Sequence, residues 1–285
     1  MPKIAAIVVT FNRLTLLQEC IQALRDQTRR PDEIIVVDNS STDGTREWLN
    51  AQLDLTVVRQ GNLGSSGGQQ TGIKTAYQKG YDWFWCMDDD TIPSPDTLER
   101  LVAASPFGAM DTGCLSSLVL GEDGNPFGSD YLLPTESAGW ATTVLNDRCI
   151  RVDLAPFVSL LVRRKAVEEV GLPVKEFFLM RDDWEFTERI SRMFKNYCVL
   201  DSRVIHKSPR ANTTEDWRTT KKFLYCIRND VLWLRLKPLS ARQKIRELTK
   251  RLLTTIYLIA RGCIPWRSLP WFFKGLFVRC RVEFP

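Results

Sequence analysis

Three consecutive aspartates, Asp88, Asp89 and Asp90, follow an apolar run over residues 81–87. Carboxylates packed this tightly repel one another, so placing them together at the end of a strand costs free energy. A divalent cation removes that cost, because hard cations take carboxylate oxygens as ligands. Side chains alternate along an extended segment, so Asp88 and Asp90 can face one side together and hold a metal that also binds a diphosphate. The alternative is a solvated acidic loop, or a cluster that caps a helix beginning near residue 94.

A second acidic cluster, Asp182, Asp183 and Glu185, falls at the start of a helix expected over residues 183–194. Carboxylates in the first turn can simply complement the helix dipole. The functional alternative is a general base held near a metal-bound substrate.

His206 is the only histidine of the chain, and it lies just beyond a strand expected over residues 197–200. A single histidine is more often structural than a metal ligand. In a chain that also carries an Asp-x-Asp pair, however, a histidine after a strand can complete an Asp/Asp/His metal set.

The elements that must position these residues alternate between strand and helix patterns. A continuous β-branched run over residues 4–10 predicts a buried strand. Further strands are expected at 33–37, 55–58, 157–162 and in the run ending at Asp88, and helices at 14–25, 42–53, 67–79 and 165–170. This alternation predicts an α/β fold with a mostly parallel sheet and right-handed crossovers. Ligands of such sheets bind at the carboxyl ends of the strands, where four polar segments fall, at residues 10–13, 38–41, 62–64 and 88–90.

Two of these polar segments open helices. Ser, Thr and Asp side chains at 41–45 are typical helix caps, whereas Asp38, at the last position of a strand, is the better candidate to accept a bond from a nucleobase or ribose hydroxyl. Residues 62–68 form a loop of small residues entering a helix, where glycines permit close backbone approach and the helix N-terminus favours anions. Its pattern matches neither the Walker motif nor G-x-G-x-x-G, which disfavours a P-loop or a dinucleotide fold. A tight turn is the alternative.

The cysteines and the N-terminal residues indicate in which cellular compartment the protein is expected. Eight cysteines are scattered through 285 residues, and no pair has Cys-x-x-Cys spacing, so a zinc site or thioredoxin motif has no support. Reduced thiols in a cytosolic protein are therefore expected. Residues 1–11 are apolar but lack a cleavage signature, and we interpret them as a first strand rather than a signal peptide.

The C-terminal region differs in charge from the rest of the chain. Ten Lys or Arg and two Glu give residues 240–285 a charge of +8, against +5 for the whole chain. An apolar run over 252–260 is too short to cross a bilayer, which takes about 20 residues. Aromatic and basic residues mix over 266–281, a pattern that favours an anionic membrane surface. A helical cap on the core, an oligomer contact and a nucleic-acid surface are the alternatives.

Several of these segments also form an ordered set, at residues 8–13, 37–45, 62–68, 87–90 and 182–186. In that order they resemble family 2 glycosyltransferases, and in particular the branch of galactofuranosyltransferases and rhamnosyltransferases. The segment that begins at His206 resembles the distal histidine of that branch, and residues 225–229 resemble its aromatic-x-x-Arg-Asn segment. The resemblance covers roughly residues 3–230, and it departs from the common residues at Arg181 and at Gln69-Gln70.

The resemblance implies a GT-A fold over residues 1–230, and the basic and aromatic pattern of the remainder predicts an amphipathic helical region over 231–285. It implies that Mn²⁺ or Mg²⁺ is held on a diphosphate by Asp88, Asp90 and His206. The residues expected at the nucleotide-sugar donor are Thr10, Asn12, Arg13, Asp38, Asn62 and Asp89. Asp183 is implied as the base for the acceptor hydroxyl, with Asp182 as the alternative, in one displacement that inverts the anomeric centre.

The expected function is sugar transfer to a growing cell-surface glycan or lipid-linked saccharide, as in O-antigen or other polysaccharide biosynthesis, at the cytoplasmic face of the membrane. The expected donor is UDP-galactofuranose, with dTDP-rhamnose as the second candidate. The alternative outside the enzymes is a scaffold subunit that binds a sugar nucleotide without catalysis. The presence of both Asp90 and Asp183 argues against it. No nucleic-acid partner is expected.

Overall fold

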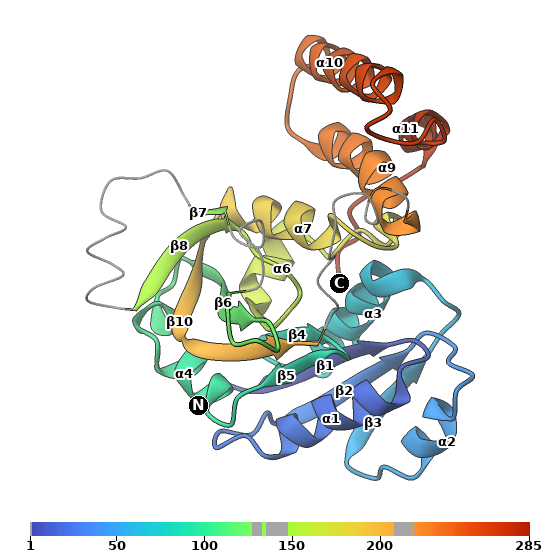
Figure 1. The fold of residues 1–285 in the computed structure, drawn as a ribbon. Helices are drawn as coiled ribbons and strands as arrows, with labels where there is room; N and C mark the ends of the chain where they lie inside the picture. Colours follow the sequence, from blue (N-terminus) through green and yellow to red (C-terminus); the bar gives the residue numbers. More distant parts are fainter. Residues whose placement is uncertain (1, 127–132, 135–147, 208–217, 219) are drawn as a thin grey trace.

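The computed structural model describes residues 2–126, 133–134, 148–207, 218 and 220–285 (Figure 1). Within these residues the strands form one ten-stranded sheet, in the order β3-β2-β1-β4-β9-β6-β10-β8-β7, with β5 pairing to β10. The strands are β1 Ile4–Thr10, β2 Glu33–Asp38, β3 Leu55–Arg59, β4 Trp83–Asp88, β5 Thr91–Pro93, β6 Thr112–Leu120, β7 Leu133–Pro134, β8 Cys149–Leu154, β9 Leu160–Arg163 and β10 Lys195–His206. The helices are α1 Leu14–Arg25, α2 Thr45–Asn50, α3 Gly64–Gln78, α4 Thr97–Ala103, α6 Arg164–Val170, α7 Asp182–Ser191, α9 Lys221–Leu236, α10 Ala241–Ala260 and α11 Ser268–Phe277, with short 3₁₀ turns η1 Ser105–Gly108 and η2 Lys175–Phe177.

The first four strands form the parallel half of the sheet, as the alternation of strands and helices predicts. Their register pairs Thr10 with Asp38 and Val9 with Asp88, so the polar residues at their carboxyl ends meet at one edge. Beyond β4 the sheet is mixed, because β9 runs antiparallel between β4 and β6, whereas β6 and β10 are parallel. The α/β class is therefore confirmed, and the parallel pairing lies mainly in the half of the sheet built from β1 to β4.

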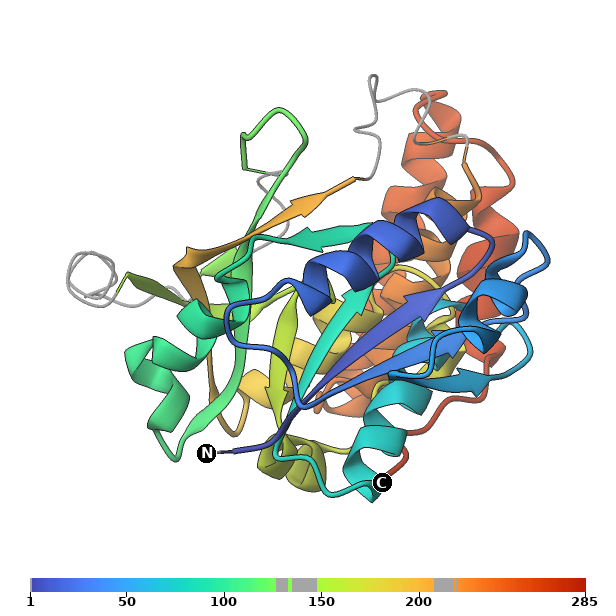
Figure 2. The same ribbon diagram turned by 90° about the horizontal axis from the view of Figure 1, so that it is seen from below.

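Helices cover both faces of the sheet. Residues of β1 alternate between two cores: Ala5 and Ile7 pack with α3, α6 and α7, whereas Ile4, Ala6 and Val8 pack with α1, α2 and α4. Every residue of β1 is buried, which explains its continuous apolar sequence. Figure 2 shows α1 lying across one face, with the C-terminal helices behind the other.

Several element boundaries differ from those expected: the strand expected at 157–162 is β9, Leu160–Arg163, the helix expected over 183–194 is α7, Asp182–Ser191, and three further differences lie near the polar segments. The helix expected over 42–53 is shortened to α2, because Asp43 accepts bonds from the backbone of Leu14 and Thr45 and Gly44 takes a left-handed φ of 91°. The small-residue loop expected over 62–68 is mostly the first turn of α3, which begins at Gly64. The strand expected at 197–200 extends over 12 residues as β10, so that His206 is its last residue rather than a residue beyond it.

The C-terminal helices α9, α10 and α11 pack together beside the sheet (Figure 1). The expected boundary at residue 230 falls inside α9, which continues to Leu236. After α11 the chain returns to the core, where the Leu172 amide donates to the Glu283 carbonyl at 2.7 Å. Among the described helices, none combines the length and the apolar sequence that a membrane crossing requires.

Candidate active site

The aspartate cluster is buried and tied to the loop that follows β1. Asp89 and Asp90 are 3% and 4% exposed. The Thr10 hydroxyl donates to Asp89 at 2.8 Å, and Arg13 Nη1 lies 3.2 Å from Asp89 and 2.7 Å from Asp90. This burial excludes a solvated acidic loop, and Asp96 rather than the cluster precedes α4. Three residues expected at the donor, Thr10, Arg13 and Asp89, are thus brought together.

His206 completes the edge of this cluster. Antiparallel pairing of β5 with β10 places His206 opposite Thr91, directly after the aspartates. Its Nε2 lies 3.2 Å from Asp90 Oδ1, and the histidine is 7% exposed. The Lys207 amide also donates to the Asp90 carbonyl at 2.9 Å, which fixes this contact. Two of the three expected metal ligands are therefore neighbours.

Asp88 lies on the other side of the cluster, toward α3. The Ser65 hydroxyl donates to Asp88 Oδ1 at 3.0 Å. Ser65 had no role in the sequence-based prediction, although its place in the small-residue segment was the available signal. In the described chain, no three His, Cys, Asp or Glu side chains are grouped as a ready-made metal site.

The pKa values of the three aspartates reflect how closely their carboxyl groups are packed. Burial, followed by the charges of Asp90 and Asp89, raises the pKa of Asp88 to about 7. Burial also raises the pKa of Asp89 to about 6, against the opposing charge of Arg13. For Asp90, burial acts upward but is outweighed by the hydrogen bond and charge of His206 and by Arg13, which hold its pKa at about 2. Crowded carboxylates with an adjacent imidazole form a donor set that suits a hard divalent cation, so these residues fit Mn²⁺ or Mg²⁺.

The loops after β1 and β2 hold each other in place. Asn12 Oδ1 accepts from the Thr42 amide at 2.7 Å, and Asp38 Oδ1 accepts from the Ser41 amide at 2.9 Å. The Asn12 amide donates in turn to the Ser41 hydroxyl at 3.0 Å. Asn12 and Asp38 therefore share the edge that carries Asp88, and both shape its loops.

Three polar residues of the α3 segment have structural partners. Asn62 Oδ1 accepts from the Gly64 amide at 2.9 Å and so caps the start of α3. Gln69 donates to the Met87 carbonyl at 3.1 Å, and Gln70 to the Pro173 carbonyl at 2.8 Å. The buried glutamines, which depart from the resemblance, thus fix α3 against the end of β4 and the chain before η2.

The second acidic cluster begins α7. Asp183 Oδ1 accepts from the Trp184 amide at 2.8 Å, and burial raises the pKa of Asp183 to about 6. Asp182 is 5% exposed, and its Oδ2 has no hydrogen-bond partner in the described part of the chain. Burial, then the charges of Asp183 and Asp88, raises the pKa of Asp182 well above its usual range. A carboxyl that keeps its proton is a poor base, so these environments favour Asp183 over Asp182 for that role.

Arg181 precedes this cluster and faces the C-terminal helices. Its Nε lies 3.1 Å from Asp230, and its guanidinium lies 4.2 Å from the centre of the Trp184 ring. Asp230 also pairs with Arg251 of α10 at 3.2 Å. The start of α7 is therefore joined to both α9 and α10.

The family follows from a match over the N-terminal part of the chain, somewhat more than half of it. The family model of Glycosyl transferase family 2 matches residues 5–171, from β1 to the end of α6. This span is more than half of the chain, so the chain belongs to glycosyl transferase family 2. It includes Thr10, Arg13 and the three aspartates, and it ends before Asp182, Asp183 and His206.

Individual relatives are similar over part of the chain. Galactofuranosyltransferase GlfT1 of Mycolicibacterium smegmatis is 38% identical over 97 residues, which cover 33% of this chain and 32% of that protein. The chain thus spans about a third of the length of this relative.

Solved structures extend the likeness to the whole fold. The structure of GalNAc-T7 with UDP, GalNAc and Mn²⁺ has a TM-score of 0.61 at 17% identity and covers 96% of this chain and 56% of that one. The mannosyltransferase PcManGT of Pyrobaculum calidifontis, with GDP-Man and Mn²⁺, has a TM-score of 0.57 at 17% identity and covers 96% and 84%. The fold is the GT-A fold of glycosyltransferases.

Proposed function

We propose that this protein is a metal-dependent inverting glycosyltransferase that transfers galactofuranose from UDP-galactofuranose to a hydroxyl of a cell-surface glycan or lipid-linked saccharide. The observation that carries the proposal is the juxtaposition of two acidic clusters, in which Asp90 and Asp182 are buried and Asp88 and Asp183 are half-buried. The first turn of α3 joins them, because the Ser65 hydroxyl donates to Asp88 at 3.0 Å and the Ser66 amide donates at 3.3 Å to the Phe178 carbonyl, in the turn that leads into Asp182. One is suited to a diphosphate with its cation, and the other to deprotonating an acceptor.

Asp88, Asp90 and His206 would hold Mn²⁺ or Mg²⁺. When bound, such an ion neutralises charge that develops on the leaving nucleoside diphosphate. The solved structures of GalNAc-T7 and PcManGT with Mn²⁺ support this assignment. Arg13 orients Asp89 and Asp90 for the same site through its two ion pairs. Thr10, Asn12, Asp38 and Asn62 build the loops around the nucleotide.

Asp183 would take the proton of the acceptor hydroxyl. The acceptor oxygen forms a bond to the anomeric carbon of the sugar while the bond from that carbon to the phosphate oxygen breaks. The electron pair leaves with the nucleoside diphosphate, and the proton passes to the Asp183 carboxylate. Attack opposite the leaving group in one displacement inverts the anomeric configuration. A positioned base contributes typically ~10²–10⁴-fold.

The choice of donor rests on the similarity to galactofuranosyltransferase GlfT1. dTDP-rhamnose is the second candidate, because the same motifs resemble rhamnosyltransferases. A non-catalytic scaffold would not need both carboxylate clusters, and each of their members is present in the structure. The acceptor hydroxyl would be bound near Trp184 and Arg181, beside Asp183.

The C-terminal helices support a membrane-bound acceptor. α10 buries only Thr255 among its residues and exposes Ile245, Leu253, Ile256 and Tyr257. Trp266, in the turn before α11, is 75% exposed, and Phe273 and Phe277 of α11 are 42% and 79% exposed. The spacing of four residues places Phe273 and Phe277 on one face of α11.

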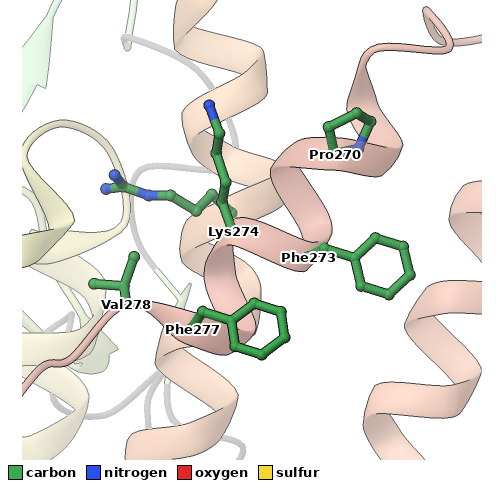
Figure 3. Close-up of a pocket in the computed structure, with 6 residues that line it drawn as sticks. Pro270, Phe273, Lys274, Phe277 and Val278 are labelled. Carbon is green, nitrogen blue, oxygen red and sulfur yellow. The ribbon is translucent and has the colours of Figure 1, made fainter.

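Figure 3 shows Phe273 and Phe277 projecting to the same side of α11, while Lys274 points away from them. These residues line an open groove of about 550 Å³ with Pro270 and Arg228. Exposed aromatic residues beside basic ones suit an anionic lipid surface. Such contact would hold the enzyme at the cytoplasmic face of the membrane, in the assembly of O-antigen or a related polysaccharide.

A panel of sugar nucleotides tests the proposed function. The protein is incubated with UDP-galactofuranose, UDP-galactopyranose, dTDP-rhamnose or GDP-mannose, with Mn²⁺ or with EDTA, and release of the nucleoside diphosphate is measured. UDP release from UDP-galactofuranose that requires Mn²⁺ supports the proposal. Turnover of dTDP-rhamnose alone would select the second donor, and nucleotide binding without release from any donor would favour the non-catalytic scaffold.

A further inference from the structure

The turn between η2 and α7 has an unusual backbone. Phe178, Met180 and Arg181 have φ values of 64°, 72° and 68°, which is the left-handed region that disfavours side chains other than glycine. Conformations of this kind persist only where surrounding groups hold them. The turn leads directly into Asp182 and Asp183, so whatever holds it also sets the place of the proposed base.

Asn229 of α9 holds this turn from one side. Its side chain is fully buried, and its Nδ2 lies 2.9, 2.8 and 2.7 Å from the carbonyl oxygens of Phe177, Leu179 and Met180. An amide has only two N–H groups, so one hydrogen is shared between two of these carbonyls. Its Oδ1 accepts from Arg228 Nε at 2.8 Å, which fixes the orientation of the amide.

The same turn contacts the metal side of the site. The Ser66 amide donates to the Phe178 carbonyl at 3.3 Å, and a Cβ at Gly64 would lie only 1.9 Å from that oxygen. Ser65, between them, donates to Asp88. The turn is therefore held between α9 and the first turn of α3, and it connects the carboxylate at the end of β4 with the start of α7.

We propose that Asn229 is a positioning residue for the transfer reaction: its amide holds the turn at 177–181 so that Asp183 lies at the correct distance from the donor bound beside Asp88. This inference rests on the proposed function. Asn229 touches neither donor nor acceptor in this account and acts through the backbone of the turn. A displacement of the base by about 1 Å is sufficient to cost about 10²-fold in rate.

The test compares Asn229→Asp and Asn229→Ala with Asn196→Asp. The aspartate variant keeps the shape but sets a carboxylate oxygen against three carbonyl oxygens, whereas the alanine variant removes the donor without adding charge. Asn196 is a matched control, because it is also fully buried and its amide donates to the Thr187 carbonyl at 2.9 Å, away from the turn.

Two quantities are measured that do not depend on the fraction of protein that is folded: the affinity for UDP and the ratio of sugar transfer to donor hydrolysis. Calorimetry with UDP and Mn²⁺ gives the affinity per competent site, and product analysis gives the ratio of sugar transfer to donor hydrolysis. We expect both Asn229 variants to bind UDP as the wild type does and to lose transfer by about 10²-fold relative to hydrolysis. Asn196→Asp should lower the melting temperature but leave the UDP affinity and the ratio of transfer to hydrolysis unchanged.

The inference is overturned if the Asn229 variants keep the wild-type ratio of transfer to hydrolysis, or if Asn196→Asp reproduces their loss. Should the aspartate variant fail to fold, the alanine variant decides. A wild-type protein that neither binds nor turns over a sugar nucleotide would instead refute the proposed function, so the two failures are distinguishable.

Discussion

His206 and Asp90, far apart in the sequence, lie 3.2 Å from each other because β5 and β10 pair directly after the aspartate cluster. The contact joins the only histidine of the chain to the carboxyl group whose pKa is held lowest in the cluster. It places an imidazole nitrogen where it can share a cation with a carboxylate.

Replacing this histidine should weaken metal use without removing the site. His206→Ala should raise the concentration of Mn²⁺ needed for half-maximal rate, because one nitrogen ligand is lost while Asp88 and Asp90 remain. The titration is repeated with His206→Gln, which keeps a polar side chain of similar reach. An unchanged titration of the alanine variant would return His206 to a structural role.

Removing a carboxylate of the cluster should have a larger effect. Asp88→Ala or Asp90→Ala should abolish transfer and metal-dependent UDP binding while the protein stays folded, as measured by calorimetry and circular dichroism. Asp54→Ala is the control, because Asp54 is exposed and pairs with Arg25 at the C-terminal end of α1. Near-normal turnover in Mn²⁺ by either cluster variant would make the metal assignment wrong.

The base should be removable without loss of donor binding. Asp183→Asn keeps the size of the side chain but cannot take a proton. Turnover should therefore fall ~10²–10⁴-fold while UDP affinity is retained. If Asp182→Asn shows this loss and Asp183→Asn does not, the roles of the two residues are exchanged.

The same base predicts a pH dependence. The pKa of Asp183 is raised to about 6 by burial, against the nearby charge of Arg181, and a protonated carboxyl cannot accept the acceptor proton. Turnover should therefore rise with pH through about 6 and level off above it. This acid limb should be missing from the residual activity of Asp183→Asn.

The contact between α3 and the turn before α7 should be visible in stability. Gly64 has a φ of 73° and no room for a Cβ, whereas Gly80 has a φ of 85° with open space around it. Gly80→Ala should cost about 1–2 kcal/mol of unfolding free energy through backbone strain alone. Gly64→Ala should cost about 2 kcal/mol more, because the Phe178 carbonyl must move as well. Equal losses in urea unfolding would mean that the close approach is not maintained in solution.

Substitutions on the exposed helices test the membrane proposal better than removal of the whole region. Deleting residues 240–285 would also remove Val282 and Glu283, which contact Gly171, Leu172 and Lys175 in the core.

Instead, Phe273→Ser with Phe277→Ser should lower co-sedimentation with anionic liposomes and leave the melting temperature unchanged, since both side chains are exposed. Leu53→Ser is the control, because Leu53 is 99% exposed and lies between α2 and β3 rather than on the C-terminal helices. A parent protein that never binds liposomes would end the membrane proposal.

The sequence predicts best what depends on neighbouring residues. The buried run of β1 and the strand before Asp88 follow from their continuous apolar sequence, and the approach of Thr10, Asp38 and Asp88 follows from parallel order alone. The antiparallel insertion of β9 is not predictable in this way, because its partners β4 and β6 lie in distant segments.

The site shows the same division. Asp88, Asp90, Asp182 and Asp183 are visible as acidic clusters. Asn229 is visible only as a member of the segment at 225–229, without a role, because its partners are backbone carbonyls that every sequence supplies. Its role becomes apparent only once α9 is packed against the turn.

One measurement addresses the central claim most directly: the anomeric configuration of the product formed from UDP-galactofuranose, followed by proton NMR in Mg²⁺. The account predicts UDP release together with a glycoside whose configuration is opposite to that of the donor, abolished by EDTA and lowered ~10²–10⁴-fold by Asp183→Asn. A product that retains the donor configuration, or transfer that continues unchanged in EDTA, would contradict it.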